Sequence, residues 1–94
     1  MQLQVLKPDD ARSELEKKSL LDIEEETART WGERAAAAFQ LASEATGEKR
    51  TRWIMDAENY RQESLEHAAM TGDMEFIGKI MKDLDEARRE VTGV

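Results

Sequence analysis

The chain has 94 residues and a formal net charge of −7, which allows one domain at most and disfavours binding to nucleic acid or to an anionic membrane surface. It contains no cysteine, which excludes disulfides, cysteine-based zinc sites and a thiol nucleophile. Aromatic residues make up only 5% of the chain, so we expect subunits to associate and gain burial. No apolar run approaches the ~20 residues of a transmembrane helix, and we expect a cytoplasmic protein.

The chain is expected to begin with a short arm over residues 1–8, followed by a long helix over about residues 9–45. The arm alternates apolar and polar residues, which predicts either a segment lying on a neighbouring subunit or a disordered tail. Pro8 followed by two aspartates is typical of a helix start, because acidic side chains favour the positive end of the helix dipole. One face of the long helix carries Leu20, Leu21, Glu24, Ala28, Trp31, Ala35, Ala38, Phe39 and Ala42.

A second helix is expected over about residues 49–71, and it has two apolar faces. At about 100° per residue, one face collects Trp53, Ala57, Tyr60, Ser64, His67 and Thr71. The other face carries Ile54, Leu65, Ala68, Ala69 and Gly72. Two apolar faces predict two packing partners, which we take to be the first helix on one side and a third helix or another subunit on the other.

The third helix is expected over about residues 74–91. Gly72 ends the preceding helix because glycine accepts the left-handed conformation, and Asp73 caps the next one. The predicted buried seam is Met74, Ile77, Ile80, Met81, Leu84, Ala87 and Val91. The spacing of Met55, Met70, Met74 and Met81 favours core packing over copper binding. These patterns predict an all-α fold, a long antiparallel helical hairpin plus a third helix, in a single domain over residues 9–94.

Two groups of residues could carry chemistry. Glu63 and His67 are four residues apart, so both reach one cation or form an ordinary helix pair. Glu24 lies in the middle of an apolar stripe with Glu25 at its edge, and burying an ionised carboxylate without a partner is costly. A metal, a histidine or another subunit would satisfy Glu24, unless it stays in solvent. With a turn near residue 48, His67 lies level with about residue 29, one turn or slightly more from Glu24.

The segments EEETARTW (Glu24 to Trp31) and LEHAAMT (Leu65 to Thr71) resemble the ferritin-like superfamily, nearest to the small encapsulated ferritins. This resemblance implies a half-ferritin hairpin in which two subunits complete a four-helix bundle and bind iron between them. It implies a metal-binding role for Glu25 and His67, with Glu63 or Glu24 as the supplementary carboxylate. Ser64 stands where the family has a second glutamate.

Two hypotheses follow from the sequence. The first is a ferritin-like homo-oligomer, a dimer or a multiple of dimers, that binds iron between its subunits in a role related to iron storage. It would be at most a weak ferroxidase, with another protein or an enclosing shell as a further partner. The second is a non-enzymatic oligomeric helical bundle that binds no metal and serves as an interaction protein.

Overall fold

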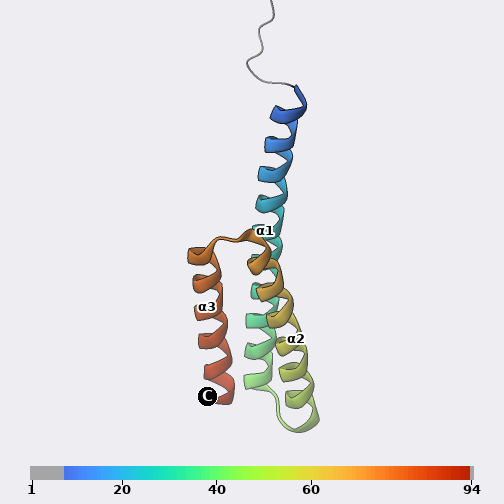
Figure 1. Cartoon of the computed structure of the whole chain (residues 1–94). Helices are drawn as coiled ribbons and strands as arrows, with labels where there is room; N and C mark the ends of the chain where they lie inside the picture. Colours follow the sequence, from blue (N-terminus) through green and yellow to red (C-terminus); the bar gives the residue numbers. More distant parts are fainter. Residues whose placement is uncertain (1–7, 94) are drawn as a thin grey trace, which may run out of the picture.

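Three α-helices make up the part of the chain that the structure describes. The computed structural model describes the backbone of residues 8–93 and the side chains of residues 19–93. The helices are α1 (Pro8–Glu44), α2 (Gly47–Thr71) and α3 (Met74–Thr92), and residues 8–93 contain no strand. In Figure 1, α2 runs back along α1, and α3 lies beside this hairpin and runs in the same direction as α1. The all-α prediction is therefore confirmed.

The boundaries of the helices agree closely with the sequence signals. Gly47 and Gly72 have positive φ angles of 62° and 69°, which reverse the chain after α1 and after α2. The Asp73 side chain accepts hydrogen bonds from the backbone N–H groups of Glu75 and Phe76, both at 3.1 Å, and so caps α3. The arm was expected over residues 1–8, but Pro8 is the first residue of α1, and residues 1–7 lie outside the described residues. Among residues 8–93, no helix is both long and apolar enough to cross a membrane.

Small side chains form the interface between α1 and α2. Residues with no exposed surface are Ala28, Ala35 and Ala42 on α1 and Ala57, Ser64 and Ala68 on α2. Because these side chains are short, the two helix backbones pack closely. Phe39, only 1% exposed, is the one large side chain fully buried among the described residues. Close packing thus lets a chain with few aromatic residues bury a core.

Helix α3 lies in the groove between α1 and α2. It buries Phe76, Ile80, Leu84 and Val91. Two ion pairs hold it to α2, from Arg61 to Asp85 at 2.9 Å and from Arg88 to Glu58 at 2.8 Å.

The predicted seam of α3 was partly wrong. Met74 and Met81 are 77% and 44% exposed, and Phe76, which the seam omitted, is buried instead. The other two methionines are also exposed, with Met55 at 60% and Met70 at 63%, so the assignment of all four to the core was wrong as well. Two overlapping sets of apolar residues with helical spacing run along α3. The set through Phe76, Ile80 and Leu84 is buried because it contacts both neighbouring helices.

The amino-terminal part of α1 extends beyond the other two helices (Figure 1). Leu20 and Leu21, expected on the buried face, are 60% and 44% exposed. The end of α2 at Thr71 lies level with about residue 20 of α1, so neither α2 nor α3 continues along α1 past this point. The apolar stripe of α1 is therefore longer than the helix that covers it.

Candidate functional site

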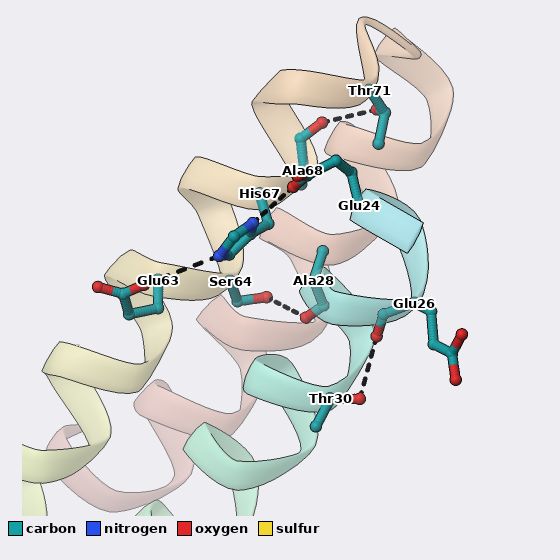
Figure 2. Close-up of polar contacts among 9 residues, drawn as sticks. All are labelled: Glu24, Glu26, Ala28, Thr30, Glu63, Ser64, His67, Ala68 and Thr71. Carbon is teal, nitrogen blue, oxygen red and sulfur yellow. Dashed lines mark hydrogen bonds and ion pairs between the residues drawn. The ribbon is translucent and has the colours of Figure 1, made fainter. Parts of the chain in front are cut away.

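His67 on α2 contacts two carboxylates, one from each helix of the hairpin (Figure 2). Its Nδ1 lies 2.5 Å from Oε2 of Glu24 on α1. Its Nε2 lies 3.9 Å from Oε2 of Glu63, one turn earlier on α2. The side chain of His67 is 28% exposed, that of Glu24 23% and that of Glu63 47%, so the cluster is accessible to solvent. Three of the four residues expected to bind metal are thus neighbours.

The position of the chain reversal brings Glu24 and His67 to the same level. The connection lies at Ala45 and Thr46, so residues equally distant from it along α1 and α2 face each other. We expected the chain to reverse near residue 48, which places His67 level with about residue 29. This level was wrong by about one and a half turns, because His67 lies beside Glu24. The contact between the rings of Trp31 and Tyr60, which are tilted by 34° with centroids 5.7 Å apart, is consistent with the same register.

Glu25, the ligand implied by the family resemblance, has a different partner. Its carboxylate pairs with Arg29 at 2.6 Å, one turn further along α1. The guanidinium of Arg29 also lies 5.3 Å from the ring centroid of Phe76 on α3. Glu25 therefore belongs to the side of α1 that faces α3, whereas Glu24 contacts His67. Glu26 is exposed, and its backbone carbonyl accepts a hydrogen bond from the hydroxyl of Thr30 at 3.0 Å.

Ser64, at the position of the family's second glutamate, is a structural residue here. It has no exposed surface, and its hydroxyl donates to the backbone carbonyl of Ala28 at 2.6 Å (Figure 2). A Cβ added to Gly32 would lie 3.2 Å from the same hydroxyl oxygen. The sequence analysis missed this role, although the small residues in the stripe of each helix were the signal for it.

One chain supplies an incomplete set of metal ligands. Among the residues whose side chains are described, no three His, Asp or Glu groups are arranged to hold a metal ion. The contact with Glu24 occupies Nδ1 of His67, which leaves Nε2 and Glu63 to face a common cation. Two donors are fewer than zinc or iron sites in proteins use. In a single chain the Glu24–His67 contact acts as a link between α1 and α2.

A second feature of the hairpin is an apolar surface turned away from α3. Leu20, Ile23 and Leu41 on α1 and Met70 on α2 are exposed by 60%, 55%, 40% and 63%. On α1, Ile23 and Leu41 lie about 180° around the helix from Gly32, which lines the groove beneath α3. On α2, His67 lies about 120° from Arg61, which binds α3. We call Leu20, Ile23, Leu41 and Met70 the uncovered face.

Comparison of the chain with models of protein families, with curated proteins and with solved structures found no match.

Proposed function

We propose that the chain is a non-enzymatic interaction protein that associates with itself through the uncovered face. A second copy of the hairpin on this face completes a four-helix bundle of two α1 and two α2 helices, with one α3 on each outer side. The supporting observation is the exposure of Leu20, Ile23, Leu41 and Met70 on the side of the hairpin that α3 leaves bare.

Burial energetics favour this assembly. Removing a leucine, isoleucine or methionine side chain completely from water contributes ~1.5–3 kcal/mol. Three of these side chains on each copy, Leu20, Ile23 and Met70, lie near the end of α2, and Leu41 lies on the same side near the connection. A symmetric dimer covers the face with an identical apolar face, so both copies gain the same burial.

Sedimentation equilibrium tests the proposal. The wild-type protein should sediment at twice the mass of one chain. Ile23→Asp places a charge on the uncovered face and should give a monomer with unchanged helical circular dichroism. Met81→Asp is the matched control, because Met81 is an exposed methionine on α3 outside that face, and it should remain a dimer. A monomeric wild type, or a dimer that tolerates Ile23→Asp, contradicts the proposal.

A second candidate function is iron binding by a ferritin-like dimer. It is favoured by the convergence of Glu24, Glu63 and His67 beside the uncovered face, because a second copy there supplies the donors that one chain lacks. Native mass spectrometry with added ferrous iron should then find about one iron per two chains, lost in His67→Ala. Glu66→Gln is the control, since Glu66 lies on the exposed side of α2 and pairs with Gln62. Protein that stays free of iron contradicts this candidate.

A further inference from the structure

The two tryptophans, the one tyrosine and the two phenylalanines of the chain differ in how far they are buried. Phe39 and Phe76 are buried, at 1% and 8% exposed. Trp31, Trp53 and Tyr60 are partly buried, and the last two pack against buried clusters of the core. Tryptophan and tyrosine combine a large apolar ring with a polar group, and such residues are enriched in interfaces. The fold therefore leaves partly exposed the aromatic residues that are typical of an interface.

These three partly exposed aromatic residues lie on the same side of the hairpin as the uncovered face, and we call them the aromatic row. Trp31 follows Leu20 by eleven residues, so the two side chains leave α1 within about 20° of each other. Trp53 and Tyr60 precede His67 by fourteen and seven residues, so all three share one side of α2. That side is the one turned away from α3.

The aromatic row connects the two separated parts of the uncovered face. Three of the four residues of that face lie near the end of α2, and Leu41 lies near the connection. Counted from the connection, Tyr60 lies level with Trp31, and Trp53 lies level with about residue 38 of α1. The row therefore lies between the two parts, and a second copy that covers both parts packs over the row in whichever direction its helices run.

Arg34 and Tyr60 fix the position of the Trp31 side chain. The rings of Trp31 and Tyr60 lie with their centroids 5.7 Å apart. The guanidinium of the exposed Arg34, one turn further along α1, lies 5.1 Å from the centroid of the Trp31 ring. An aromatic side chain that is already held in one position loses less conformational entropy when a partner covers it. These contacts therefore prepare Trp31 for association.

We propose that the aromatic row is the centre of the interface between two copies, and that Arg34 is a positioning residue that holds Trp31 for this contact. The inference rests on the proposed self-association and names the residues on which it depends. Tryptophan, tyrosine and arginine are the residues that most often dominate the binding free energy of an interface, and they cluster near its centre. The residues of the uncovered face then surround the aromatic row and exclude water from it.

Tryptophan fluorescence tests whether association covers the aromatic row. Trp53→Phe keeps an aromatic side chain at its position and leaves Trp31 as the single tryptophan of the chain. Diluting this variant through the concentration range in which sedimentation shows dissociation should shift the emission of Trp31 to longer wavelength, because the indole returns to water. Emission that stays constant while the dimer dissociates overturns the central position of the row and leaves self-association intact. A wild type that is monomeric at every concentration overturns self-association itself.

Two arginines of α1 provide a matched pair of variants. Arg34 lies over Trp31, whereas Arg29 lies over Phe76, 5.3 Å from its ring centroid, on the side that faces α3. Arg34→Ala should raise the dissociation constant of the dimer about tenfold, counted over both copies. Arg29→Ala should leave it unchanged. Trp31→Ala should raise it about a thousandfold, because losing a central aromatic side chain costs about thirtyfold in each copy.

The stability of the monomer separates positioning from folding. Urea denaturation at a concentration at which the protein is monomeric should give the same unfolding midpoint for Arg34→Ala and for the wild type, because Arg34 is exposed. An increase in the dissociation constant without a change in this midpoint supports the positioning role. Equal dissociation constants for Arg34→Ala and Arg29→Ala, or a lower unfolding midpoint that accompanies the weaker association of Arg34→Ala, overturn it.

Discussion

The close packing of Gly32 on Ser64 predicts an interaction free energy that can be measured. Replacing a helical glycine by alanine stabilises an exposed helix by ~1 kcal/mol. At Gly32 the added methyl group lies 3.2 Å from the Ser64 hydroxyl oxygen, and no other atom outside the surrounding helix lies within 4 Å. That oxygen is held by its 2.6 Å hydrogen bond to the carbonyl of Ala28. We expect the strain to offset most of the helix gain, so that Gly32→Ala changes the free energy of unfolding by less than ~0.5 kcal/mol.

The Ser64→Ala background removes the obstructing oxygen. This change alone should cost ~1 kcal/mol, the net contribution of one buried hydrogen bond, because the Ala28 carbonyl keeps its bond within α1. Adding Gly32→Ala should then stabilise the protein by the full ~1 kcal/mol. The interaction free energy in the double-mutant cycle is therefore ~0.5–1 kcal/mol, with the double variant more stable than additivity predicts.

Urea denaturation followed by circular dichroism measures the cycle, at one protein concentration throughout because self-association affects stability. Gly78→Ala on α3 is the matched control. A Cβ at Gly78 meets no atom within 4 Å, so this change should stabilise both backgrounds by the same ~1 kcal/mol. If Gly32→Ala stabilises the wild type and the Ser64→Ala variant equally, the packing of α1 on α2 differs from the one described.

Three further predictions concern α3 and the histidine cluster, each measured by the same denaturation experiment. Asp73→Ala should cost ~1 kcal/mol because two backbone N–H groups lose their acceptor, and Asp73→Asn should restore most of the loss. Phe76→Ala should cost ~3 kcal/mol, whereas Met74→Ala at an exposed position should cost little; equal losses would contradict the burial of α3. His67→Ala should cost less than ~1 kcal/mol because its carboxylate partners are partly exposed, and a loss above ~2 kcal/mol would show that the cluster is buried by a second copy.

The candidate residues around His67 illustrate how far a sequence pattern reaches. Glu24 was marked by its place in an apolar stripe, and His67 and Glu63 by their spacing of four residues. Each of these is a property of one helix. The contact of Glu24 with His67 depends on the residue at which the chain reverses. If the reversal shifts by about two residues, the residue of α1 that faces His67 shifts by about four. The pattern alone therefore did not distinguish Glu24 from Glu25 as the partner of His67.

The sequence by itself determined the features whose causes are local. Pro8, Gly72 and Asp73 start, stop and cap helices through their own backbone preferences and hydrogen bonds, so these boundaries were predicted correctly. Tertiary structure alone decided which of two equivalent series on α3 is buried, and so why Phe76 is covered and Met81 is exposed. It also decided that the apolar stripe of α1 extends beyond the end of α2. Helical periodicity states which residues share a face, whereas the neighbour that covers the face depends on where distant segments pack.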